Sequence, residues 1–370
     1  MFGRRSQQGK TQPSDPQKDH TRAVEAYNAG RLDTARAAFQ VLAEKGFAKS
    51  QYNFGMMNRR GEGGPRNFEA AKHWLLRAAQ AGLHEGFLEI GVAYSNGEGV
   101  DQDKSEAVLW YMRAALAGSP MAACYLGHAY RLAEGVSVDI PLAIIFYEQA
   151  VAGGQTDAFN ALGTIYDNGV GVAVDRVRAA ELYEGGVAAG DGLAAKNLAR
   201  LLEFGWGVER DVARAISLYE LAISRGILEA SNELACLLGD LPETQQNQVR
   251  RVELLSQAAR LGDLRAQYNL ARALTQGGAS PDAREQALQL YHSAAQAGLV
   301  EAQSYLGEWF AVFSDPRDPV EAAFWWGLAA EQGDETAALN FDSVMQALDA
   351  ETTRAVSDRL RQHKTDAAHK

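Results

Sequence analysis

Small and apolar residues recur along this chain at a spacing of 36 residues. In each period a small residue is followed four positions later by a large apolar residue, and then at once by another small residue. Glycines mark the period at Gly46, Gly82, Gly118, Gly154, Gly190, Gly226, Gly262 and Gly298, with Gly333 after 35 residues. A pattern kept over so many segments indicates internal repeats. The predicted repeats are 47–82, 83–118, 119–154, 155–190, 191–226, 227–262, 263–298 and 299–333.

Each repeat is predicted to contain two amphipathic helices, joined in most repeats by a short glycine-containing loop that the sixth and eighth repeats lack. In the fourth repeat, the apolar residues from Ala158 to Tyr166 follow the period of a helix. Gly171 lies in the break that follows, and Asp175 is placed to cap the second helix. Gly190 then ends that helix, because glycine adopts the left-handed conformation without strain.

One small residue in each first helix requires a packing explanation. Gly163 lies inside the helical stripe, where glycine costs about 1 kcal/mol relative to alanine. We expect the paired helix to approach closely there, with Tyr183 filling the space. Because 36 residues cannot bury a sufficient core alone, neighbouring repeats must stack. The predicted fold is therefore all-α, a right-handed α-solenoid, or superhelix, of about eight two-helix repeats.

The repeat resembles a known family. The pattern A-x-x-x-LG-x-x-Y-x-x-G-x-GV-x-x-D-x-x-x-A-x-x-x-Y-x-x-A-x-x-x-G is followed, with one or two departures each, by residues 158–190 and 86–118. It is similar to the Sel-one-like repeat, a relative of the tetratricopeptide repeat with a longer loop between its helices. The resemblance covers 47–333. Residues 23–46 resemble a shorter, tetratricopeptide-type unit, and 334–362 resemble a half repeat with a capping helix.

Charge and composition narrow the classes of function. The chain has 36 basic and 47 acidic residues, a net charge of −11, which argues against nucleic-acid binding. Residues 1–22 are predicted to be a disordered basic tail, and 363–370 a flexible tail. No apolar stretch resembles a signal peptide or an integral membrane segment. The two cysteines offer no disulfide framework. We expect a cytoplasmic, bacterial protein.

The resemblance implies a binding scaffold that uses its concave face, which the first helices line. By register, Arg131, Asn160, Lys196 and Arg200 lie on this face. Together they are placed to clamp a carboxylate or an acidic peptide, as in tetratricopeptide carboxylate clamps. The alternative interpretation is solvated surface charge, which we favour for these residues.

Two further positions attract a functional interpretation. His128 shares a helical face with Cys124, but two ligands do not make a zinc site, which needs about four. His128 is therefore kept as a partner-binding candidate only. Trp206 occupies a variable loop position, where it is either a partner anchor or packed against a neighbouring loop.

Catalysis has little support in the sequence. No H-E-x-x-H, C-x-x-C or G-x-S-x-G string is present, and the glycine loops lack the lysine of a phosphate-binding loop. We expect no catalytic residue, cofactor or metal. The predicted function is a non-catalytic adaptor for a protein or peptide partner, with its oligomeric state left open. The alternatives are a hydrolase built on the same repeats and a regulator that docks on membranes through its basic tails.

Overall fold

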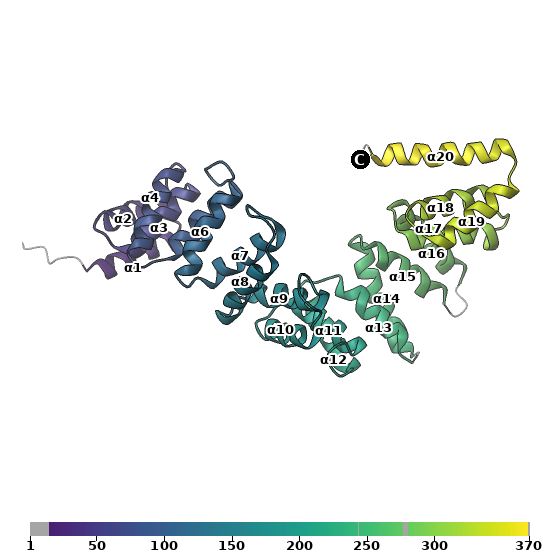
Figure 1. The fold of residues 1–370 in the computed structure, drawn as a ribbon, viewed down its shortest axis with the longest axis horizontal. Helices are drawn as coiled ribbons and strands as arrows, with labels where there is room; N and C mark the ends of the chain where they lie inside the picture. Colours follow the sequence, from purple (N-terminus) through teal and green to yellow (C-terminus); the bar gives the residue numbers. More distant parts are fainter. Residues whose placement is uncertain (1–14, 243, 277–279, 369–370) are drawn as a thin grey trace, which may run out of the picture. The chain divides into compact units, whose positions relative to one another are not determined.

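A computed structural model describes residues 15–242, 244–276 and 280–368. Over these residues the secondary structure is helical and contains no strand. The chain divides into two compact units, which we call unit 1 (up to Ala194) and unit 2 (from Ala195). Figure 1 labels the helices of both units.

The helices of unit 1 are α1 (Pro16–Asn28), α2 (Leu32–Glu44), α3 (Ala48–Arg60), α4 (Phe68–Gln80), α5 (Glu85–Asn96), α6 (Lys104–Leu116), α7 (Pro120–Leu132), α8 (Ile140–Ala152), α9 (Thr156–Asn168) and α10 (Arg176–Ala188). Helix α11 (Gly192–Phe204) begins in unit 1 and lies mostly in unit 2. Unit 2 continues with α12 (Val212–Ser224), α13 (Ala230–Asp240), α14 (Gln245–Arg260), α15 (Leu264–Thr275), α16 (Pro281–Gln296), α17 (Val300–Glu308), the π-helical turn η1 (Trp309–Phe313), α18 (Pro319–Glu331), α19 (Glu335–Ala347) and α20 (Ala350–Ala368).

Consecutive helices pack as pairs, and each pair packs on the next. In unit 1 the pairs are α1 with α2, α3 with α4, α5 with α6, α7 with α8, and α9 with α10. In each pair from α1 with α2 to α17 with α18, we call the odd-numbered helix the first helix and the even-numbered helix the second helix. The second helix of one pair also contacts the first helix of the next, as α6 does with α7 and α8 with α9. The predicted all-α class of stacked helix pairs is confirmed.

A close contact within the helix pair explains the small residue of each first helix. A Cβ atom added to Gly163 would lie 2.6 Å from Cε1 of Tyr183, a distance that real Cβ contacts do not reach. The same contact joins Gly127 to Tyr147, also at 2.6 Å. Tyr147 and Tyr183 are fully buried. The predicted packing of Tyr183 against Gly163 is therefore confirmed, and it lets the two helices approach closely.

The helix ends follow the repeat as well. One residue per period accepts a hydrogen bond from the backbone N–H three residues further along, at the start of the second helix. These N-cap residues are Asn67, Asp103, Asp139, Asp175 and Asp211. Gly190 has the expected left-handed backbone, with φ of 91°. Both predictions for the fourth repeat, the cap at Asp175 and the end at Gly190, are confirmed.

The terminal boundaries differ from the predicted ones. Helix α1 begins at Pro16, inside the segment 1–22 predicted as a tail, because Asp15 caps it and proline favours the first helical position. The buried His20 attaches α1 to the first repeat through a 2.9 Å hydrogen bond between its Nδ1 and Ser50 Oγ. Helix α20 runs to Ala368, through most of the tail predicted over 363–370. Residues 1–14 and 369–370 lie outside the described residues.

Candidate functional site

Second-helix tyrosines carry their hydroxyl groups to the first helices. The Tyr147 hydroxyl lies 2.9 Å from Nδ1 of His128 and accepts a hydrogen bond from Nε of Arg131 at 3.3 Å. In the next repeat, Tyr183 donates to Thr164 Oγ1 at 3.4 Å. The structure thus brings together two predicted site residues, His128 and Arg131, around one buried phenol.

A cavity of about 400 Å³ opens between α5 and α7 in unit 1. His128 lines it, together with apolar and aromatic side chains of α5, α6 and α7. An ion pair at 2.9 Å between Lys104 and Glu134 lies in its wall. The other lining residues are Val92, Ser95, Asn96, Ala107, Val108, Tyr111, Tyr125, Ala129 and Leu132. We call this space the α5–α7 cavity.

The protonation states of Cys124 and His128 do not suit covalent catalysis. Their Sγ and Nε2 atoms are 3.6 Å apart. Burial raises the pKa of the Cys124 thiol to about 12, and burial, helped by the charge of Arg131, lowers the pKa of His128. A thiol and a neutral imidazole are therefore favoured at neutral pH, whereas catalytic cysteines have lowered pKa values. The described residues contain no group of three or more metal-binding side chains.

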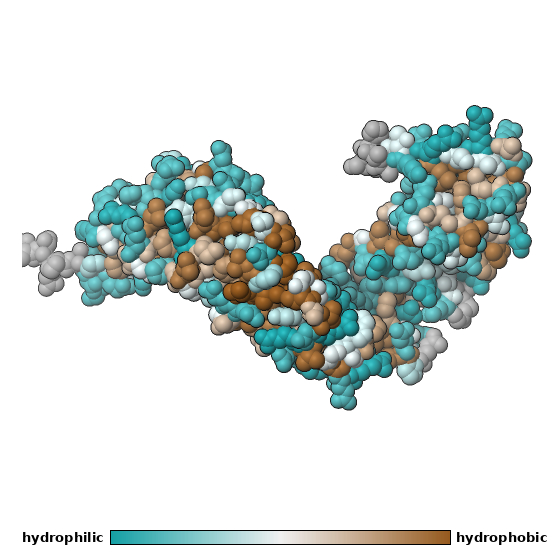
Figure 2. All heavy atoms as spheres, in the orientation of Figure 1, coloured by the Kyte–Doolittle hydropathy of each residue, from teal (hydrophilic) through white to brown (hydrophobic). Residues whose placement is uncertain are grey.

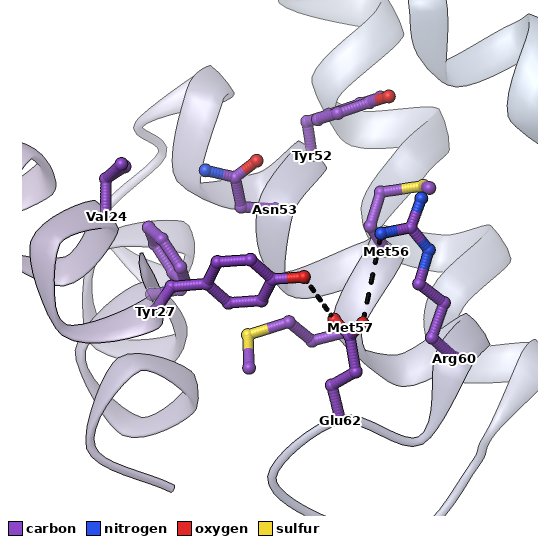
Figure 3. A pocket seen from close by; sticks show the side chains of 9 residues that line it. Val24, Tyr27, Tyr52, Asn53, Met56, Met57, Arg60 and Glu62 are labelled. Carbon is purple, nitrogen blue, oxygen red and sulfur yellow. Dashed lines mark hydrogen bonds and ion pairs between the residues drawn. The ribbon is translucent and has the colours of Figure 1, made fainter. Parts of the chain in front are cut away.

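A smaller cavity of about 160 Å³ lies between α1 and α3, and we call it the α1–α3 pocket. Figure 3 shows Val24 and Tyr27 on one side, Tyr52, Met56 and Arg60 on the other, and Asn53 between them. The Tyr27 hydroxyl donates to Oε2 of Glu62 at 2.9 Å, and Arg60 forms a 3.9 Å ion pair with the same carboxylate. Phe39 and Met57 complete the lining.

In unit 2, the first-helix charges lie among carboxylates of the same unit. Burial raises the pKa of the Glu233 carboxyl, and the nearby charges of Lys196 and Arg200 oppose this rise. Glu203 accepts a 2.7 Å hydrogen bond from Tyr219, and burial also raises its pKa. Lys196 and Arg200 thus have internal partners for their charge.

The remaining predicted residues lie apart from these contacts. Asn160 is on α9 in unit 1, where its backbone carbonyl accepts from Thr164 at 2.8 Å. Trp206 follows α11 in unit 2 and stacks on Phe204, with 4.7 Å between ring centroids. The predicted carboxylate clamp draws on both units, so the geometry within each unit leaves it a prediction.

Sequence reasoning missed the α1–α3 pocket and most of the α5–α7 cavity. Tyr52, Asn53 and Arg60 in the first repeat, and Tyr125 and Leu132 in the third, occupy positions outside the consensus. Only their exclusion from the repeat pattern signalled a role. Their assembly into cavities depends on the distance between neighbouring first helices, which no sequence spacing states.

Hydrophobic surface gathers over the middle of unit 1. Figure 2 shows it around α7 and α8. The exposed large apolar side chains of these helices are Met121, Tyr125, Leu132 and Ile145. Among the described helices, none is both long enough and apolar enough to cross a membrane.

Comparisons with known proteins identify the family. The Sel1 repeat model matches residues 48–83, 88–119, 120–155, 157–191, 192–227, 228–263, 264–299 and 300–334. A protective antigen present in uropathogenic Escherichia coli strains, which displays an SLR fold, is similar at 27% identity and a TM-score of 0.84, over 94% of this chain and 76% of that one. A Sel1 repeat protein from Oxalobacter formigenes is similar at 27% identity and a TM-score of 0.55, over 65% of this chain and 96% of that one. A comparison with curated proteins gives no match. With eight matched segments along most of its length, the chain belongs to the Sel1 repeat family.

Proposed function

We propose that this chain is a non-catalytic interaction scaffold that holds a protein or peptide partner on its first-helix face. The observation that carries the proposal is the α5–α7 cavity. Residues that recur in most repeats, such as Tyr147 and Tyr183, are buried in the helix pairs. The α5–α7 cavity is lined by the recurring Tyr111 but also by residues such as Tyr125, His128 and Leu132, which differ from repeat to repeat. Side chains that the packing of the helix pairs does not require are available to recognise a partner.

The exposed apolar surface supports a protein partner. Tyr125 is 37% exposed and Leu132 is 52% exposed, and both line the α5–α7 cavity. Apolar side chains gathered around a cavity are typical of interaction sites, and tyrosine is enriched among the residues that dominate binding energy. Such a surface gains free energy when a partner covers it.

The enzyme alternative can be examined at Cys124 and His128, where a possible nucleophile lies beside a possible base. The raised pKa of Cys124 leaves the thiol protonated, and the hydroxyl of the fully buried Tyr147 contacts the other ring nitrogen of His128, Nδ1, at 2.9 Å. These contacts support a packing role for the pair. A hydrolase would require a nucleophile whose pKa is lowered by its surroundings.

The partner's chemistry and the location of the protein belong to the same proposal. Recognition of a carboxylate by Arg131, Asn160, Lys196 and Arg200 stays a prediction, as does membrane docking through the basic tails. Cys124 and Cys236 are both free, which is compatible with the reducing bacterial cytoplasm in which we place the protein.

Two matched substitutions test the scaffold proposal. Leu132→Arg adds a charge at the α5–α7 cavity, whereas Ile145→Arg adds the same charge on the second helix α8, at 58% exposure. Affinity capture followed by direct titration of the captured partner should show at least about a tenfold loss of affinity for Leu132→Arg and little change for Ile145→Arg. Equal affinities for both variants, or turnover of a substrate that His128→Ala abolishes, would contradict the proposal.

A further inference from the structure

We propose that the α1–α3 pocket anchors one large apolar side chain of an extended, acidic peptide segment in a partner protein. The inference rests on the proposed function and names the chemistry of the partner. It places the anchor at the junction between the N-terminal helix pair and the first 36-residue repeat.

The size of the pocket selects a single side chain. Its volume is about 160 Å³. An apolar cavity of about 150 Å³ holds a benzene molecule, whereas sites for cofactors and drug-sized ligands begin near 300 Å³. A leucine, methionine or phenylalanine side chain therefore fits the pocket, and a cofactor does not.

The lining suits an apolar occupant of variable shape. Phe39, Met56 and Met57 are buried and form an apolar surface, to which Val24 adds. Methionine side chains adapt their shape to different apolar partners, because they are unbranched and polarizable. The pocket thus favours large apolar side chains in general over one particular residue.

Asn53 supplies groups that can bind a peptide backbone. It lies on α3 between the two walls of the pocket, and it is half-buried (Figure 3). Among the described residues, none forms a hydrogen bond with its carboxamide. The amide carries two donors and one acceptor, so it can pair with both the C=O and the N–H of an extended segment. Such pairing would hold the peptide across the pocket while its side chain enters.

The segment that contains the pocket has a positive net charge, which favours an acidic peptide although Glu62 adds one carboxylate to the pocket lining. Residues 15–80 contain eleven Lys and Arg against seven Asp and Glu, a net charge of +4. Residues 81–370 contain 22 against 40, a net charge of −18. Arg60 stands in the pocket wall with its side chain 49% exposed, and its ion pair with Glu62 is long at 3.9 Å. It therefore retains N–H donors for a carboxylate next to the anchor. An acidic segment is attracted to this end of the chain and repelled by the remainder.

Selection of peptides by the full chain tests the proposal. A displayed library of random nine-residue peptides is selected against the protein, and the enriched peptides are synthesised with blocked termini and titrated. We expect one Leu, Met or Phe per peptide, flanked by Asp or Glu. Replacing that residue with alanine should weaken binding about tenfold or more, and added NaCl should weaken it further.

Three variants of the full chain locate the binding. Val24→Phe fills the pocket, and Arg60→Glu reverses the charge in its wall. Lys45→Glu makes the same change of charge at an exposed position of the basic region that does not line the pocket. The first two variants should lose about tenfold in affinity, and Lys45→Glu should stay within about twofold. Thermal unfolding verifies that each variant is folded.

Several results would overturn the proposal. They are failure to enrich any peptide, enriched peptides without an apolar residue or with an excess of Lys and Arg, and equal affinity of the wild type and Val24→Phe. A dimer that Arg60→Glu dissociates would show that a second copy occupies the pocket. The capture experiment with Leu132→Arg and Ile145→Arg remains independent of all of these, so the scaffold function can stand where the pocket fails.

Discussion

Unit 1 and unit 2 are built from the same helix pair, but their first-helix faces differ. In unit 1 this face holds the α1–α3 pocket and the α5–α7 cavity, lined mainly by apolar and aromatic side chains. In unit 2 it holds Lys196, Arg200 and two carboxyl groups, Glu203 and Glu233, whose pKa values burial raises. The cavities described in unit 2 lie along α14, and many of their lining residues are Gln, Arg and Glu.

The difference shows how a repeat fold separates stability from recognition. Lys196 and Arg200 of unit 2 lie near the Glu233 carboxyl, so a partner that binds these two side chains would have to compete with an interaction inside the unit. The cavities of unit 1 contain apolar surface that only a partner can cover. We therefore expect unit 1 to contribute most of the binding energy, although both units share the same buried framework.

The largest expected effect concerns the close helix contact of unit 1. Gly163→Leu places a side chain where even a Cβ atom would lie 2.6 Å from Tyr183, and it should lower the free energy of unfolding by about 1–3 kcal/mol. Unit 2 has Ala199, Ala235 and Ala271 at the same repeat position and glycine at Gly307, whereas unit 1 has glycine there in each of its four repeats, so glycine is required more often in unit 1. Chemical denaturation measures the change. Ala152→Leu, on an exposed position of α8, is the control, and a loss of equal size there would disprove the assigned contact.

The hydrogen bonds of the tyrosine hydroxyls should contribute different amounts to the free energy of unfolding in the two units. Tyr219→Phe removes a 2.7 Å bond to the Glu203 carboxyl and should cost about 1.5 kcal/mol. Tyr183→Phe removes a longer 3.4 Å bond to Thr164 and should cost less than about 1 kcal/mol. Denaturation of both variants decides the order. Equal costs would mean that the carboxyl group adds nothing to the Tyr219 bond.

A smaller effect is expected from pH at the start of unit 1. Burial, followed by the charge of Lys49, lowers the pKa of His20 from its usual 6.5. Below about pH 6.5 the unfolded state therefore binds the proton more strongly, and α1 loses stability as the pH falls towards the lowered pKa of the folded state. Hydrogen exchange of α1 should accelerate between pH 7.5 and about 5.5, after correction for the intrinsic rate.

Two comparisons sharpen this pH prediction. His20→Gln removes the titrating group and should remove the pH step in α1. Helix α12 contains no histidine and contacts Glu203, whose raised pKa makes the folded state bind its proton more strongly. The protection of α12 against hydrogen exchange should therefore stay the same or increase as the pH falls. A step of equal size in α12, or one that survives His20→Gln, would contradict the assignment.

The smallest effect is expected for the basic pair of unit 2. The double variant Lys196→Ala/Arg200→Ala should keep the affinity for a captured partner within about twofold, because both charges already lie near Glu233. Capture with the wild type and the double variant measures this directly. Loss of the partner would instead support the predicted carboxylate clamp and shift recognition to unit 2.

Most of the framework follows from the sequence because it repeats. The 36-residue spacing placed Gly163 against Tyr183 and Asp175 at a helix start, and the structure confirms both contacts. The same residue types occur at equivalent positions in other repeats, so their presence in the fourth repeat is not a chance occurrence. The physical demands of a helix pair are the same each time they occur.

The candidate site could not be predicted in the same way. Asn53 and Tyr52 become meaningful only when α1 packs beside α3, and that packing depends on His20, whose contact with Ser50 spans 30 residues. The start of α1 at Pro16 is predictable from the sequence, since an Asp N-cap followed by Pro is a common helix start. The basic composition of the neighbouring segment obscured it.

The central claim, that a partner is held on the first-helix face of unit 1, has one direct measurement. Hydrogen exchange with mass spectrometry compares the full chain alone and with a captured partner. We predict slower exchange in α1, α3, α5 and α7 and little change in α12 to α14. Protection confined to unit 2 or to the second helices α4, α6 and α8 would contradict the account.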